Sequence, residues 1–222
     1  MKTIIGAEAA RWAGLQIDLN QKYRAGHITA DHLEWFNGLK RVERDRLSGI
    51  TSPDMRFELV KMLDITVPDG YVHATQLTTF TEAHRGEFYY FNGGITDENF
   101  SRATTQLKPG QKLKVDVFQI KETVTSEDCM RFLKSQKAIL TGAQGASLVY
   151  EQKREELPKG KWHVSFDEKE TLWQDAGGFH RVPNVRAYTD GDFCFCLGYF
   201  EGDWYGNGCL LSFRDAEPVS GE

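Results

Sequence analysis

The sequence predicts an α+β fold, built on a mainly antiparallel sheet with a few helices and preceded by an N-terminal helical pair. After residue 56, short runs rich in β-branched and aromatic residues follow one another, and glycine or proline turn signals separate most of them. Two segments between these runs, 76–84 and 126–136, have the pattern of helices. Because strands outnumber helices and short turns join several neighbours, we predict an antiparallel sheet rather than a doubly wound one. The predicted strands are FELVKMLDITV, FYYF, KLKVDVFQI, AILTG, SLVYE, KWHVSF, FCFCLGYF and CLLSF.

Residues 1–47 are predicted to form the N-terminal helical region. From Ala7 to about Arg24, apolar residues recur at three- and four-residue steps, which is typical of one face of a helix. After Gly26, Thr29 is a suitable N-cap for a second helix. Both helices carry apolar side chains that need a surface to pack against. These are Trp12, Leu15, Leu19 and Tyr23 in the first helix and Trp35, Phe36 and Leu39 in the second.

Three further boundaries follow from turn-forming residues. Serine, glycine and proline in the segment 48–56 predict a linker. The α+β domain is then expected to span residues 57–215, and residues 216–222, AEPVSGE, to form a flexible tail. A chain of 222 residues is long enough for such a domain and a small helical appendage.

Composition and charge bear on the partners and the compartment. The formal net charge is −5 and no basic face is evident, so the counterion release that drives nucleic-acid binding has no source. The N-terminus breaks into Gly, Glu and Arg before a signal peptide could form, and no segment approaches the roughly 20 apolar residues of a membrane span. We therefore predict a cytoplasmic protein without membrane contact or cofactor, whose partner is an unknown protein or small molecule. Its four cysteines are expected to be thiols.

Three of these cysteines lie in the segment 190–213, DGDFCFCLGYFEGDWYGNGCLLSF. Side chains alternate along a strand, so Cys194 and Cys196 point to one face, and Cys209 on the return strand could lie across from either. The other face of the first strand would carry Phe193, Phe195 and Leu197. A structural zinc site uses four thiolate or imidazole ligands, which Cys-x-Cys plus one cysteine does not supply. We predict a thiol-lined sheet face and no metal, although metal binding by the three cysteines stays open.

The same segment carries four aromatic residues in or beside a glycine-rich loop. Exposed rings there would form a recognition surface, whereas buried rings would close one end of the core. Both readings stay open. The residues of this candidate binding surface are Tyr199, Phe200, Trp204 and Tyr205.

A second candidate site is a thiol with a distant histidine. If Thr125 caps the helix predicted at 126–136, Cys129 lies near its first turn, where the helix dipole favours a thiolate. His163 follows in a predicted strand, with Asp167 on the same strand face. This chain order resembles that of papain-like and transglutaminase-like enzymes, with Cys129 as nucleophile, His163 as base and Asp167 as the orienting group.

Two features of the sequence weigh against this thiol site. Glu127 and Asp128 precede Cys129, and their negative charge would raise the pKa of its thiol. Cys129 also shares a helix face with Phe132 and Leu133, which is typical of a small core residue. Whether Cys129 and His163 meet in space stays open.

Five motifs of the chain are KPGQKLKVDVFQI, TSEDCMRFLKSQKAILTGAQGASLVYEQ, LPKGKWHVSFDEKETLW, HRVPNV and DGDF followed by LGYFE. Together they resemble a family of uncharacterised proteins from reduced-genome candidate-lineage bacteria. The similarity covers about Phe57 to Asp215. It implies a bacterial, cytoplasmic protein and transfers no activity and no site residue.

Three functional hypotheses follow from the sequence. The first is a cytosolic, non-enzymatic binding or interaction module, whose contact surfaces are the helical leader and the aromatic loop. The alternative is a cysteine-dependent hydrolase or transferase that uses Cys129 and His163. The third is a self-associating homo-oligomer.

Overall fold

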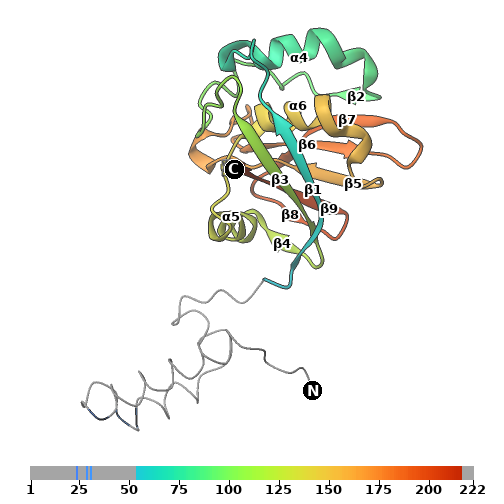
Figure 1. Ribbon diagram of the computed structural model, residues 1–222. Helices are drawn as coiled ribbons and strands as arrows, with labels where there is room; N and C mark the ends of the chain where they lie inside the picture. Colours follow the sequence, from blue (N-terminus) through green and yellow to red (C-terminus); the bar gives the residue numbers. More distant parts are fainter. Residues whose placement is uncertain (1–23, 25–28, 30, 32–53, 217–222) are drawn as a thin grey trace. The chain divides into compact units, whose positions relative to one another are not determined.

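The structure, a computed structural model, describes residues 24, 29, 31 and 54–216 (Figure 1). The chain divides into two units, residues 1–53 and 54–222. The predicted N-terminal helical pair, most of the predicted linker and nearly all of the predicted tail lie outside the described residues. The fold is therefore that of residues 54–216, which we call the domain.

Seven strands of the domain form one mixed sheet in the order β1-β3-β9-β5-β6-β7-β2 (Figure 1). Four of the six strand pairs in this sheet are antiparallel, and the β5–β9 and β2–β7 pairs are parallel. A second sheet pairs β4 with β8. The predicted α+β fold with a mainly antiparallel sheet is confirmed. The strands are β1 (Phe57–Thr66), β2 (Tyr90–Phe91), β3 (Lys112–Ile120), β4 (Val124–Thr125), β5 (Lys161–Val164), β6 (Arg181–Ala187), β7 (Phe193–Tyr199), β8 (Asp203–Trp204) and β9 (Gly208–Asp215).

Three α-helices pack on the sheet: α4 (Gln76–His84), α5 (Ser126–Ser135) and α6 (Gly142–Lys153). The first two lie where the sequence predicts helices. Short 3₁₀ turns at His73–Thr75, Arg85–Glu87, Arg154–Glu156 and Lys169–Thr171 connect other elements.

The strands that were predicted at AILTG and SLVYE are wrong. Residues 142–153 form α6, and before it Ile139 makes a single bridge to Phe213. Every residue from Gly142 to Tyr150 is buried. A helix enclosed on all sides carries no polar stripe, so its sequence lacks the 3.6-residue period, and its Leu-Val-Tyr run resembles a buried strand.

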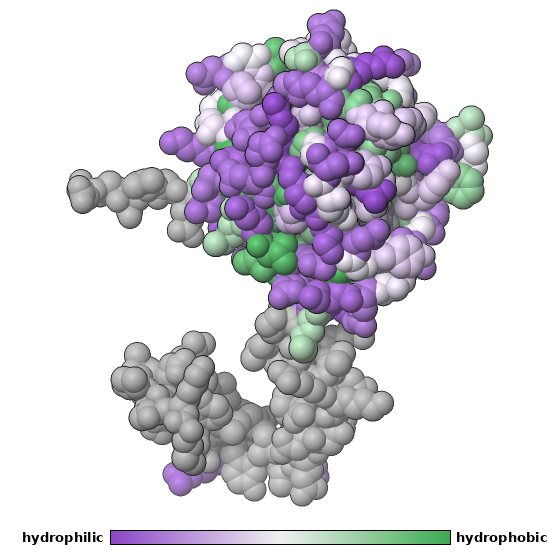
Figure 2. Space-filling model, turned by 90° about the vertical axis from the view of Figure 1, so that its right-hand side faces the viewer, coloured by the Kyte–Doolittle hydropathy of each residue, from purple (hydrophilic) through white to green (hydrophobic). Residues whose placement is uncertain are grey.

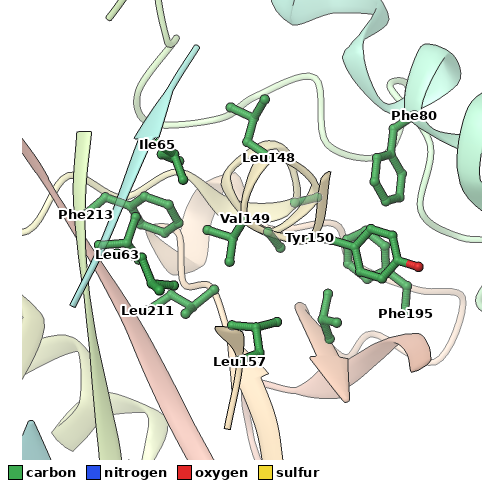
Figure 3. Close-up of a cluster of buried hydrophobic side chains, with 14 of the residues drawn as sticks. Leu63, Ile65, Phe80, Leu148, Val149, Tyr150, Leu157, Phe195, Leu211 and Phe213 are labelled. Carbon is green, nitrogen blue, oxygen red and sulfur yellow. The ribbon is translucent and has the colours of Figure 1, made fainter. Parts of the chain in front are cut away.

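The two faces of the sheet carry separate hydrophobic cores, because adjacent residues of a strand point to opposite faces. We call the core between the sheet and helices α4 and α6 the α6 core (Figure 3). We call the core beneath α5 the α5 core. Residues of the α6 core include Leu63, Ile65, Phe80, Leu148, Val149, Tyr150, Leu157, Val185, Phe195, Cys209, Leu211 and Phe213. Those of the α5 core are Phe57, Ile120, Val124, Cys129, Met130, Phe132, Leu133, Leu140, Val164, Phe166, Leu172, Val182, Phe200 and Leu210.

Helix α5 is fixed at both ends by its own sequence. The Thr125 side chain accepts the backbone N–H of Asp128 at 3.2 Å, and the Asp128 carboxylate faces the N–H of Thr125, which forms a capping box. At the other end, Lys137 has a φ of 55°, and the N–H of Ala138 reaches the carbonyl of Leu133 at 3.0 Å. This is a Schellman ending, with lysine in the left-handed position that glycine usually takes.

The surface of the domain is mostly hydrophilic on the side seen in Figure 2, and its hydrophobic residues gather in small patches. No helix among the described residues is both long and apolar enough to cross a membrane. Exposed large apolar residues lie along β1, around β2, at the end of β7 and in the loop between β8 and β9. They include Met55, Leu59, Val60, Met62, Tyr89, Tyr90, Phe179, Tyr199 and Tyr205.

Candidate functional site

Cys129 lies inside the α5 core and has no exposed surface. Burial raises the pKa of its thiol, and the adjacent Asp128 carboxylate raises this pKa further. The dipole of α5 favours a thiolate at this position but is outweighed by these two effects. The thiol is therefore protonated at neutral pH and enclosed by apolar side chains.

His163 is equally buried, in the middle of β5. Its Nδ1 donates to the carbonyl of Val185 at 3.1 Å, because a carbonyl can only accept. Its Nε2 is buried and has no hydrogen-bond partner among the described residues. Burial lowers the pKa of His163 to about 4, so its imidazole is neutral at pH 7.

The structure does not bring Cys129 and His163 together. His163 lies beside Val185 and Cys209 in the strand register, and both of these belong to the α6 core. The next residue, Val164, belongs with Cys129 to the α5 core. His163 therefore points to one face of the sheet, whereas Cys129 packs on the other.

Asp167 also has partners other than the histidine. It follows β5, is 3% exposed, and accepts backbone N–H groups of Thr104 at 3.1 Å and Glu168 at 2.8 Å. Burial raises the pKa of this carboxyl, and these hydrogen bonds oppose the shift. Asp167 thus ties the loop at Thr104 to the start of α6, where it lies against Gly142.

We expect Cys129 to resist alkylation in the native protein. A buried thiol with a raised pKa reacts only after local opening. Mass spectrometry after a short iodoacetamide pulse at pH 7.5 should show Cys129 unmodified, with Cys196, which is partly exposed, modified first. Complete labelling in urea serves as the control. Rapid and selective labelling of Cys129 would instead restore the thiol-enzyme hypothesis.

The hairpin cysteines separate into two groups. Phe193 and Phe195 belong to the α6 core, so Cys194 and Cys196 line the opposite face, as predicted. Cys209 does not lie across from either, because β9 pairs with β3 and β5 rather than with β7. It packs in the α6 core, on the other side of the sheet. Within the described residues, no group of three or more His, Cys, Asp or Glu side chains is placed to hold a metal ion.

The four aromatic residues of the loop after β7 divide in the same way. Phe200 is buried in the α5 core, and Trp204 packs against it while its Nε1 donates to Ser126 Oγ at 2.8 Å. Tyr199 and Tyr205 are 48% and 56% exposed. These residues therefore do not form one continuous recognition surface, because two of them close the α5 core.

A different aromatic surface lies on the face of the sheet that also carries α5, across strands β2, β7, β6 and β5. The strand register aligns Tyr90, Cys194, Arg186 and Trp162 in one row across β2, β7, β6 and β5. Tyr188 lies beside this row, two residues after Arg186 and directly after β6, and its hydroxyl accepts from Cys194 Sγ at 3.5 Å. We call Tyr90, Trp162, Arg186, Tyr188 and Cys194 the aromatic face.

The centre of the aromatic face is a positive charge held between two rings. The guanidinium carbon of Arg186 lies 4.7 Å from the ring centroid of Trp162 and 4.3 Å from that of Tyr188. Both distances are within the range of cation–π attraction. Arg186 Nη1 donates to the Tyr188 hydroxyl at 3.5 Å, and its Nε is buried without a hydrogen-bond partner in the part of the chain that the structure describes.

The thiols beside Arg186 are not poised for chemistry. Burial raises the pKa of Cys196 to about 12, and the neighbouring Cys194 contributes in the same direction. Arg186 opposes this rise but does not cancel it. The Cys196 thiol is therefore protonated at neutral pH, and Cys194, which is buried, is a small side chain in the floor of the aromatic face.

Sequence reasoning missed the aromatic face. Its members come from β2 and from the three consecutive strands β5, β6 and β7, and each taken alone resembles an ordinary strand residue. The sequence did indicate the thiol-lined face of β7. The residues beside it on β6 and β2 can be named only when the order of the strands in the sheet is known.

Two cavities of the domain lie away from the aromatic face. The larger, about 870 Å³, is formed by the loops at 104–111 and 138–140, and its charged lining includes the Lys134–Glu168 ion pair at 2.9 Å. The smaller, about 190 Å³, lies beside α4. Cys129, His163 and Asp167 line neither cavity.

Comparisons of the chain with protein-family models, with curated proteins and with solved structures find no match.

Proposed function

We propose that the chain is a cytosolic, non-enzymatic binding module that contacts its partner through the aromatic face. The observation that carries this proposal is the Arg186 guanidinium, which is held between the rings of Trp162 and Tyr188. Tryptophan, tyrosine and arginine are the residue types that dominate the binding energy of protein interfaces. Because these three residue types meet on the aromatic face, we assign the contact with the partner to this face.

The rigidity of the aromatic face supports this role. Arg186 and Cys194 lie on strands hydrogen-bonded on both sides, and Trp162 lies on β5, between β9 and β6. A contact surface on strands inside a sheet loses little conformational entropy when a partner binds. Tyr90, at the β2 edge, is 49% exposed and adds ring area that a partner can cover.

The positions of Cys129 and His163 favour a binding role over the thiol-enzyme alternative. A nucleophile and its base must come within hydrogen-bond reach, and these two residues point to opposite faces of the sheet. The cytosolic assignment is supported by the four cysteines, all of which are free thiols.

Site-directed photo-crosslinking in the full-length chain tests this proposal. A benzophenone amino acid is placed at Tyr90, and the chain is irradiated in lysate of the organism that encodes it. We expect a discrete crosslinked adduct that is identified by mass spectrometry and is lost in the Trp162→Ala variant. The same amino acid at Tyr199, which is 48% exposed on the opposite end of β7, is the matched control.

The crosslinked products distinguish two contact surfaces and show whether the partner is a second copy of the chain. An adduct from Tyr90 alone supports the aromatic face. Adducts from Tyr199 alone would move the contact to the loop after β7 and would contradict the proposal. An adduct with the mass of two chains would identify the partner as a second copy.

A further inference from the structure

Arg186 differs from the other partly buried arginines of the domain. Each of those lies within ion-pairing distance of a carboxylate, whereas Arg186 makes no ion pair with any described residue. The paired residues are Arg56 with Asp54, Arg154 with Glu87, Arg181 with Asp175 and Arg214 with Asp116. Asp192, whose backbone pairs with that of Tyr188, is exposed and does not reach Arg186.

The hydrogen-bonding capacity of Arg186 is also largely unused within the domain. A guanidinium has five N–H donors, and the domain engages one of them in a long contact to the Tyr188 hydroxyl. The buried Nε has no acceptor among residues 54–216. Arg186 Nη2 donates to no described residue and, unlike Nε, is not among the buried atoms without a partner, so it is the donor that an acceptor from outside the domain can reach, while the two rings hold the guanidinium in place.

The shape of the surface indicates what kind of molecule supplies this acceptor. Small-molecule sites are concave, and neither of the two cavities described above borders the aromatic face. A sheet face lined with Tyr, Trp and Arg is instead suited to a protein surface.

The charge of the acceptor follows from Arg186, because one guanidinium balances one carboxylate. A phosphate carries roughly −1.5 to −2 charges and is typically met by a cluster of cations.

We propose that Arg186 recognises a carboxylate side chain of a protein partner through its planar guanidinium, with Trp162 and Tyr188 as the walls of the contact. This inference rests on the proposed function, because it specifies the chemistry of the partner that the aromatic face takes. Arginine is required rather than lysine, since a guanidinium both stacks on rings and binds a carboxylate through two parallel hydrogen bonds.

The experiment is an NMR titration of the full-length, ¹⁵N-labelled chain with octaglutamate, using octaglutamine as the uncharged peptide. The readout is the indole N–H resonance of Trp162, assigned with the Trp162→Phe variant. We expect a saturable shift with octaglutamate and none with octaglutamine. Arg186→Gln should weaken binding about tenfold or more, and Arg186→Lys should weaken it to an intermediate degree.

The matched control is Arg102→Gln, which removes an exposed arginine that has no ion pair in the domain. Its affinity for octaglutamate should equal that of the wild type. An equal response of wild type and Arg186→Gln would overturn the carboxylate assignment, as would the absence of any shift. If photo-crosslinking at Tyr90 still gave an adduct that depends on Trp162, the aromatic face would remain a contact surface and only its acidic ligand would be rejected.

Discussion

Replacing Phe80 by alanine is expected to lower the free energy of unfolding by about 3–5 kcal/mol. The Phe80 side chain has no exposed surface, and its ring lies 5.7 Å from the ring centroids of both Tyr150 and Phe195 (Figure 3). Removing the ring leaves a cavity at the junction of α4, α6 and the sheet, which aromatic neighbours cannot refill. The ring centroid of Phe91, on β2, lies 6.3 Å from that of Phe80, so removal of the Phe80 ring should loosen β2 as well.

Urea denaturation followed by circular dichroism measures this loss. Phe179→Ala is the matched control, because it makes the same change at a ring that is 47% exposed, where we expect a change within about 0.5 kcal/mol. Equal urea midpoints for the Phe80→Ala and Phe179→Ala variants would show that the Phe80 ring of α4 is not part of the core of the native protein.

Lowering the pH from about 6.5 to about 4 should remove about 3 kcal/mol of stability through His163 alone. The imidazole has a pKa near 6.5 in the unfolded chain and about 4 when it is buried. Between these values the unfolded chain takes up a proton that the native protein does not. This contribution to stability is therefore complete above pH 6.5 and is lost as the pH falls toward 4.

The His163→Gln variant isolates this effect. Glutamine can still donate to the Val185 carbonyl but does not titrate. We expect its unfolding free energy to fall less steeply than that of the wild type when urea denaturation is repeated between pH 7.5 and pH 4.5. Parallel profiles would mean that His163 is protonated in the native state, and a titration of its imidazole by NMR would then show a midpoint near 6.5 rather than near 4.

Local patterns in the sequence predicted some of the fold well. The alternation around Cys194 assigned each face of β7 correctly, because side-chain direction in a strand depends only on its own backbone. Helix α5 was predicted because its Thr125 cap and its apolar face are both readable within ten residues. Helix α6 was not, because burial on all sides removed the polar positions that reveal a helical period.

The candidate site depended on information of another kind. The pairing of Cys129 with His163 assumed that a helix and a strand bring their side chains to the same side of the sheet, which is decided by the connections between them. Placing Cys209 opposite β7 made a similar assumption, since a hairpin is the usual reading of two nearby strands. The chain instead passes through β8, which pairs with β4, before β9 enters the sheet elsewhere. Trp162 and Arg186 became a recognisable pair only through this strand order.

The position of β9 also constrains how the domain is made. This strand is the last of the described strands in sequence order, yet it lies between β3 and β5, joining β1 and β3 to the other four strands of the sheet (Figure 1). A ribosome therefore releases both halves of the sheet before the strand that unites them. Until then, β3 and β5 expose unpaired edges that other nascent chains could join. Completion of the sheet must therefore await the synthesis of β9, and folding and aggregation compete until that strand is available.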